Sequence, residues 1–284
     1  MHEHSGLGRE GRRLKRRADY FFASGAFARF QIADFADSLL ALGPTVAIGG
    51  FPRDLYLCGN RQFRSDVDFV VDAASLTAFD RLTARLGGTP NSFGGCRIDL
   101  GRWMADVWPL ERTLAAVFGH VTVSCMRDLL RTTFFDWDAI LYSVGDRKLI
   151  TDHAWFDRIN RRVLDINLEP NPNPLGAAVR AIRCAYRWEA AFGERLAAHV
   201  AKQIMDHGWQ SLADRDRCSF PSAVLGGLDG DAVFAAVHAH SRNGGAPLRL
   251  PLRPAQTAFD LVGGCARPPS VPGMRRRRQA VIQR

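Results

Sequence analysis

Residues 46–72 read VAIGGFPRDLYLCGNRQFRSDVDFVVD and decide the fold of the chain. An apolar strand ends in the pair Gly49-Gly50, and a second apolar strand opens with Asp66 and Asp68. A glycine pair after a strand lets backbone N–H groups approach phosphate oxygens that a Cβ atom would hold away. Residues two apart on a strand point to one face, so Asp66 and Asp68 can share divalent cations. The stretch therefore predicts a site for a nucleoside triphosphate with Mg²⁺.

The order of these parts resembles the head domain of the class II CCA-adding enzyme and bacterial poly(A) polymerase family. In that family a strand leads to GG-x-x-RD, and an Asp-x-Asp follows on the next strand after a spacer. The matching residues here are Gly49, Gly50, Arg53, Asp54, Asp66 and Asp68. The match continues more weakly from Ile98 to about Ala185. The resemblance implies an α+β fold, with a mixed sheet and flanking helices in the head and a small helical neck and body after it.

The chain of 284 residues is long enough for one large domain or two small ones. Helical periodicity before residue 43, strand-like runs to residue 151 and helical patterns after residue 174 suggest the boundaries. The expected parts are a basic leader (1–17), a head with an N-terminal helix (18–172), a helical neck and body (173–266) and a basic tail (267–284).

The lengths of the apolar runs and the use of cysteine limit the cellular setting. No apolar run reaches the roughly 18 residues of a membrane span, and the N-terminus lacks the apolar core of a signal peptide. The six cysteines are scattered singly, which suits a reducing compartment. We therefore expect a cytoplasmic protein without a membrane partner.

The net charge of +9 is concentrated at the two ends of the chain. Residues 1–17 carry a net charge of +4 and residues 267–284 carry +6, so the intervening body is close to neutral. Basic tails commonly contact nucleic-acid phosphates through counterion release. A solvated end without a partner is the alternative interpretation of the tail, and the composition does not choose between the two.

The resemblance also implies a third acidic residue on a hairpin that follows the second strand. Asp106 is the matching position, and it would complete a three-carboxylate metal site with Asp66 and Asp68. Asp99 is the alternative, and spacing alone does not choose between them. Asp106 is favoured.

Four arginines are candidate nucleotide contacts. Arg53 follows the glycine pair and is expected to assist it with the triphosphate, and the resemblance adds Arg131, Arg180 and Arg183. The family's base-reading side chains, a Glu-Asp pair and an Arg, are replaced here by Asn173, Pro174 and Ala177. This departure argues against faithful CCA addition.

The sequence thus predicts an Mg²⁺-dependent nucleotidyltransferase that moves a nucleoside monophosphate from a nucleoside triphosphate to a hydroxyl acceptor. The family resemblance and the basic ends favour an RNA 3′ end, of a tRNA or another RNA, as the acceptor. Transfer to a protein or a small molecule is a rival of the same chemistry. A catalytically silent nucleic-acid-binding module with the same fold is a rival of a different class.

Overall fold

The head is built on a mixed β-sheet. The computed structural model describes residues 8–23, 27–91 and 94–254, and within them seven strands pair in the order β3-β4-β5-β2-β1-β6-β7. The strands are β1 (Thr45–Ile48), β2 (Val67–Val71), β3 (Thr89–Pro90), β4 (Cys96–Asp99), β5 (Met104–Pro109), β6 (Ile140–Ser143) and β7 (Lys148–Thr151). β2 pairs with β5 in parallel and with β1 in antiparallel orientation. The predicted α+β class with a mixed sheet is confirmed.

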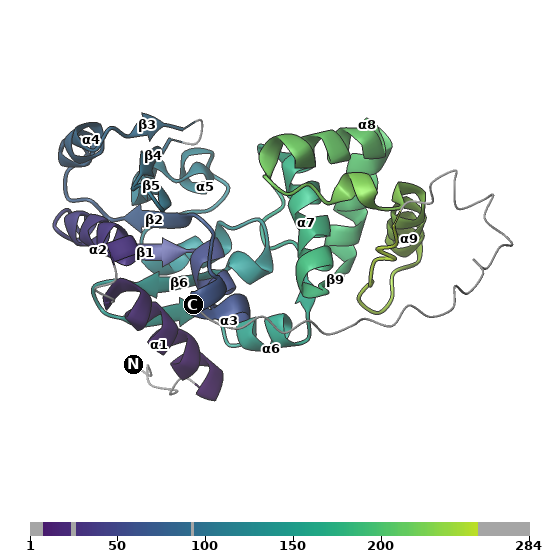
Figure 1. Ribbon diagram of the computed structural model, residues 1–284, viewed down its shortest axis with the longest axis horizontal. Helices are drawn as coiled ribbons and strands as arrows, with labels where there is room; N and C mark the ends of the chain where they lie inside the picture. Colours follow the sequence, from purple (N-terminus) through teal and green to yellow (C-terminus); the bar gives the residue numbers. More distant parts are fainter. Residues whose placement is uncertain (1–7, 24–26, 92–93, 255–284) are drawn as a thin grey trace, which may run out of the picture.

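Helices from the first half of the chain cover one face of this sheet (Figure 1). They are α1 (Arg9–Ala23), α2 (Phe27–Leu40), α3 (Gly50–Gln62) and α4 (Leu76–Arg85). Strand side chains alternate between faces, so Val67, Phe69 and Val71 of β2 point into the main apolar core. Phe21 of α1 and Phe51 of α3 pack edge to face within that core, with their ring centres 5.0 Å apart.

The opposite face of the sheet carries a smaller apolar cluster. Val46, Val70 and Leu141 pack there against Leu110 and Leu129. The covering elements on this side are short, among them α5 (Leu114–Val117) and a 3₁₀ helix over Met126–Arg131. Because Asp68 alternates with Phe69 along β2, its side chain belongs to this thinly covered face.

A helical part follows the head and stands beside it in Figure 1. After α6 (Trp155–Asn160), it consists of α7 (Pro174–Trp188), α8 (Glu194–Ser219) and α9 (Gly230–Asn243), with the short parallel strands β8 (Val163–Leu164) and β9 (Ala191–Phe192). The Asn173 side chain accepts a hydrogen bond from the Gly176 N–H and starts α7 just before Pro174. Within α7, Val179 and Ile182 are buried, whereas Tyr186 is 54% exposed.

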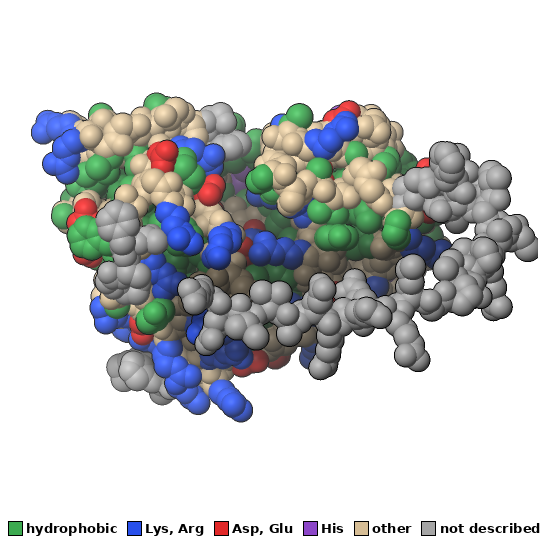
Figure 2. Space-filling model, viewed as in Figure 1, with side chains coloured by type: hydrophobic (Ala, Val, Ile, Leu, Met, Phe, Trp, Pro, Cys, Tyr) green, Lys and Arg blue, Asp and Glu red, His purple; other side chains and the backbone are tan. Residues whose placement is uncertain are grey.

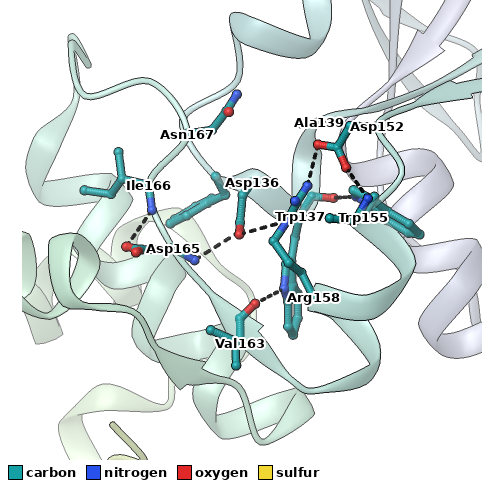
Figure 3. A network of polar contacts seen from close by, with 12 residues as sticks. Asp136, Trp137, Ala139, Asp152, Trp155, Arg158, Val163, Asp165, Ile166 and Asn167 are labelled. Carbon is teal, nitrogen blue, oxygen red and sulfur yellow. Dashed lines mark hydrogen bonds and ion pairs between the residues drawn. The ribbon is translucent and has the colours of Figure 1, made fainter. Parts of the chain in front are cut away.

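A polar network ties the end of the head to the helical part (Figure 3). The Asp165 N–H donates to the Asp136 carboxylate at 3.0 Å, and the Trp137 indole N–H donates to the Val163 carbonyl at 2.5 Å. The Arg158 guanidinium bridges the carboxylates of Asp152 and Asp136, at 2.7 and 3.4 Å. The network fixes the chain between the sheet and α7.

Of the two basic ends of the chain, the structure describes part of the N-terminal one. The leader predicted for residues 1–17 is helical from Arg9 onward, because Leu14, Ala18 and Phe21 bury one face of α1 in the head. The tail at 267–284 lies outside the described residues. None of the described helices combines the length and apolarity that crossing a membrane requires.

Candidate functional site

A cavity of about 460 Å³ lies between the thinly covered face of the sheet and α7. The head contributes Gly49, Gly50 and Asp68, and α7 contributes Gly176 and Arg180. These residues come from segments more than 100 positions apart, and the cavity brings the predicted glycine pair, one predicted carboxylate and one predicted arginine together.

The glycine pair forms the junction between β1 and α3. Gly49 has φ +67°, a conformation that favours glycine, and its N–H is used in a hydrogen bond of 3.2 Å to the Ile140 carbonyl. Any phosphate contact from this turn must therefore come from Gly50, whose N–H group opens α3 and has no carbonyl partner within the helix. A helix N-terminus of this kind attracts anions.

Two of the predicted carboxylates lie on neighbouring strands, on the same face of the sheet. Asp68 and Asp106 are paired positions of the parallel strands β2 and β5, and Asp66 precedes Asp68 by two residues. Burial, together with the charges of Asp106, Asp66 and Asp138, raises the pKa of Asp68 to about 7. Burial also raises the pKa of Asp66, against the opposing effect of the Arg97 charge. The alternative, Asp99, lies at the hairpin and accepts a hydrogen bond from the Gly101 N–H at 2.7 Å.

Arg97 is a member of this cluster that the sequence analysis did not identify. It is the register partner of Asp106 across β4 and β5, and its guanidinium donates to both oxygens of that carboxylate, at 3.0 and 2.5 Å. It also lies 3.5 Å from a carboxylate oxygen of Asp66. The sequence shows a strand here but not which carboxylate faces the arginine, because strand register is set by tertiary pairing.

These contacts decide how far the cluster fits a divalent cation. Within the described ranges, no group of three His, Cys, Asp or Glu side chains is arranged to hold a metal ion. Arg97 already binds both oxygens of Asp106, so the three-carboxylate site does not fit in this arrangement. Asp66 and Asp68 fit better, because crowded carboxylates leave excess negative charge that a cation neutralises.

Arg53 is predicted to contact the triphosphate, but in the structure its side chain bonds to carboxylates at the wall of the cavity. Its guanidinium donates to Asp54 at 2.8 Å and to Asp138, and it lies 5.2 Å from the ring centre of Trp188. The Ser65 hydroxyl also donates to Asp54, which is buried. Asp138 itself lines the cavity, so Arg53 holds a cavity carboxylate in place. Asp138 was missed as a site residue, because its contact with Arg53 joins positions 85 apart in the sequence.

The other three predicted arginines lie in different places in the structure. Arg180 lines the cavity, with its guanidinium 5.7 Å from the ring centre of Phe135. Arg183 turns toward the helical part and forms an ion pair of 2.7 Å with buried Asp216. Arg131 is exposed and bonds to Asp128 at 2.8 Å. Only Arg180 of the three lines the cavity, and a second cavity arginine, Arg215 of α8, was not predicted.

Comparisons with known proteins give structural likenesses only. No protein-family model matches the chain, and no curated protein matches it. A tRNA-processing enzyme solved with CTP is 20% identical, with a TM-score of 0.43, over 65% of this chain and 49% of that one. The Thermotoga maritima CCA-adding enzyme complexed with tRNA is 18% identical, with a TM-score of 0.48, over 68% of this chain and 46% of that one. The chain thus spans about half the length of these two proteins.

Proposed function

We propose that this protein is a nucleotidyltransferase that moves a nucleoside monophosphate from a nucleoside triphosphate to the 3′ hydroxyl of an RNA. The observation that carries the proposal is the composition of the cavity. The N-terminus of α3 at Gly50 and the Arg180 side chain supply positive potential, and Asp68 supplies a carboxylate beside them. This pairing of an anion-binding helix end with crowded carboxylates suits a triphosphate carried with a divalent cation.

The residues have distinct parts in such a transfer. The acceptor hydroxyl gives its proton to water as its oxygen forms a bond to the α-phosphorus. The bond to the pyrophosphate oxygen breaks, so negative charge grows on the leaving pyrophosphate. The Gly50 N–H group and the Arg180 guanidinium stabilise that charge without reorganising. Arg53 keeps the Asp138 carboxylate fixed at the wall of the cavity.

Asp66 and Asp68 are the residues that would hold Mg²⁺, which stabilises the phosphate oxygens electrostatically when bound. Asp68 is the more important of the two, because it lines the cavity, whereas Asp66 does not and its side chain is 49% exposed. Asp106 acts through its pairing with Arg97. This role differs from direct metal binding, which the family resemblance implied for it.

An RNA acceptor is supported by the family resemblance and by the concentration of basic residues near the N-terminus. Base choice is expected to differ from CCA addition. Ala177, which stands where the family has a base-reading arginine, is buried, and the Asn173 side chain is used in capping α7.

The test is a transfer assay with the full chain. We would incubate it with each labelled nucleoside triphosphate, Mg²⁺ and a short RNA, and resolve the products by length. We expect extension of the RNA by at least one triphosphate, none on an RNA that lacks the 3′ hydroxyl, and loss of nearly all transfer in Asp68→Asn. Asp99→Asn is the matched control, because Asp99 is an exposed carboxylate of the neighbouring hairpin. No transfer by the folded protein, or unchanged transfer by Asp68→Asn, would contradict the proposal.

A further inference from the structure

A second cavity, of about 440 Å³, opens at the far end of α3 from the glycine pair. Four arginines line it: Arg13, Arg16 and Arg17 of α1 and Arg61 of α3. Its lining includes no aspartate or glutamate. Figure 2 shows Lys and Arg side chains gathered over α1, at the lower left of the molecule. We call these four arginines and Tyr20 the basic cavity.

The helical repeat explains why the arginines converge. Arg13, Arg16, Arg17 and Tyr20 recur at helical spacing on one side of α1. Leu14, Ala18 and Phe21 on the other side are fully buried, which fixes the rotation of the helix. The arrangement is therefore built into the fold and does not depend on flexible side chains finding one another.

Arg17 has a structural part in the basic cavity. Its guanidinium donates to the carbonyls of Leu55 and Tyr56, at 2.7 and 2.8 Å, where α3 breaks at Gly59. Burial, and then the charge of Arg13, lower the pKa of Arg17. The structure records no ion pair for Arg13, Arg16 or Arg61 within the residues it describes. Arginines that face one another without an acid repel, and a bound polyanion would relieve that repulsion.

Tyr20 adds an aromatic surface to this cavity. The residue is 60% exposed although its ring is large and apolar. The Arg29 guanidinium lies 5.1 Å from the ring centre, and it also donates to the Asn60 carbonyl at 3.1 Å. An exposed ring held in place among arginines is the combination with which proteins stack unpaired bases and track a phosphate backbone.

A basic connection leads from this cavity toward the first one. Cys58 lines the basic cavity, and its sulfur accepts a hydrogen bond from the Arg187 guanidinium of α7 at 3.7 Å. Arg187 follows Arg180, which lines the first cavity, by two helical turns, or about 10 Å along α7.

We propose that the basic cavity binds a single-stranded segment of RNA, with its phosphates on Arg13, Arg16 and Arg61 and an unpaired base on Tyr20. Single-stranded RNA fits better than a duplex, because stacking on Tyr20 requires a base that is free of its neighbours. That the bound strand is the acceptor of transfer rests on the proposed function, whereas RNA binding itself does not.

The test measures RNA affinity without nucleoside triphosphate. A fluorescent single-stranded RNA of 12 nucleotides would be titrated with the full chain at several salt concentrations and followed by anisotropy. The variant Arg13→Glu, Arg16→Glu reverses two charges that have no structural bond. The matched control is Arg81→Glu, Arg85→Glu, which makes the same change at two exposed arginines of α4.

For Arg13→Glu, Arg16→Glu we expect at least about a tenfold loss of affinity and a log–log salt slope smaller by about 1.4, or about 0.7 for each lost phosphate contact on a single strand. Tyr20→Ala should weaken binding severalfold with the salt slope unchanged, because stacking releases no counterions. The α4 control should bind as the wild type does.

Equal losses in the two charge-reversal variants, or none in either, would overturn the proposal. A loss of affinity for duplex RNA of the same size, with single strands unaffected, would overturn its single-stranded part. Failure here is distinguishable from failure of the proposed function. Nucleotide transfer to RNA with no dependence of affinity on Arg13 and Arg16 refutes only this inference, and arginine-dependent binding without transfer refutes only the enzymatic proposal.

Discussion

Arg97 and Asp106 face each other across β4 and β5, and the guanidinium of Arg97 donates to both oxygens of the Asp106 carboxylate. The Asp106 side chain is only 10% exposed, whereas that of Arg97 is 50% exposed. The arginine therefore reaches the carboxylate cluster from its open side and supplies the cluster with a fixed positive charge. This relationship separates the buried carboxylate on β5 from Asp68 on β2 and from Asp66 just before that strand.

The first prediction concerns Arg97 and metal affinity. Arg97→Ala frees Asp106 and removes the positive charge beside Asp66, so the cluster should bind Mg²⁺ several times more tightly. The measurement is the rise in melting temperature as Mg²⁺ is added. Arg112→Ala is the control, because Arg112 forms a similar bidentate pair with exposed Asp80. Equal or weaker stabilisation by Mg²⁺ in Arg97→Ala would show that Asp106 is not a latent ligand.

The second prediction concerns the pH dependence of stability. The pKa of Asp68 is about 7 in the folded protein and near 3.8 in an unfolded chain, so the folded state holds the proton more tightly. This group therefore loses stabilising effect as pH rises from about 4 to about 7. Asp68→Asn removes that loss. We compare the free energy of unfolding of Asp68→Asn with that of the wild type, both in EDTA. This difference should be more favourable to the variant at pH 8 than at pH 4 by on the order of 2 kcal/mol.

Urea denaturation of the wild type and of Asp68→Asn at both pH values gives this difference. Asp99→Asn is the control and should show a much smaller dependence. If the stability gap between wild type and Asp68→Asn were the same at pH 4 and pH 8, the Asp68 carboxylate would not carry the raised pKa.

The third prediction concerns the buried contacts of Arg53. Arg53→Met leaves the carboxylates of Asp54 and Asp138 without their cation, and we expect a loss of about 3 kcal/mol in the free energy of unfolding. Adding Asp138→Asn should recover part of the loss, with a coupling energy of at least about 1 kcal/mol. Arg217→Met, which breaks an exposed pair with Asp214, should cost less than about 0.5 kcal/mol. Additive losses in the double variant would mean that Arg53 does not hold Asp138.

The fourth prediction concerns base choice. Asn173, Pro174 and Ala177 stand where the resembling family reads the incoming base, so the protein should not switch from C to A during addition. The assay offers CTP and ATP, separately and together, with a tRNA that lacks its terminal CCA. Ordered completion of CCA would show that base choice does not require those side chains.

The sequence by itself determined the local backbone. The glycine pair that follows β1 and the apolar strand that follows Asp66 each depend on a few neighbouring residues, and both occur as predicted. The expectation that Asp66 and Asp68 share one face rests on the strand period of two, although β2 begins only at Val67. These features needed no knowledge of the rest of the molecule.

Only the tertiary structure decided the partners of the charged residues. Arg53 meets Asp138 across 85 positions, and Arg183 meets Asp216 across 33. Long charged side chains follow no local periodicity, and a carboxylate is paired by whichever arginine the packing of distant elements brings within reach. The same reason explains the basic cavity, where the burial of Leu14, Ala18 and Phe21 turns the arginines of α1 toward Arg61.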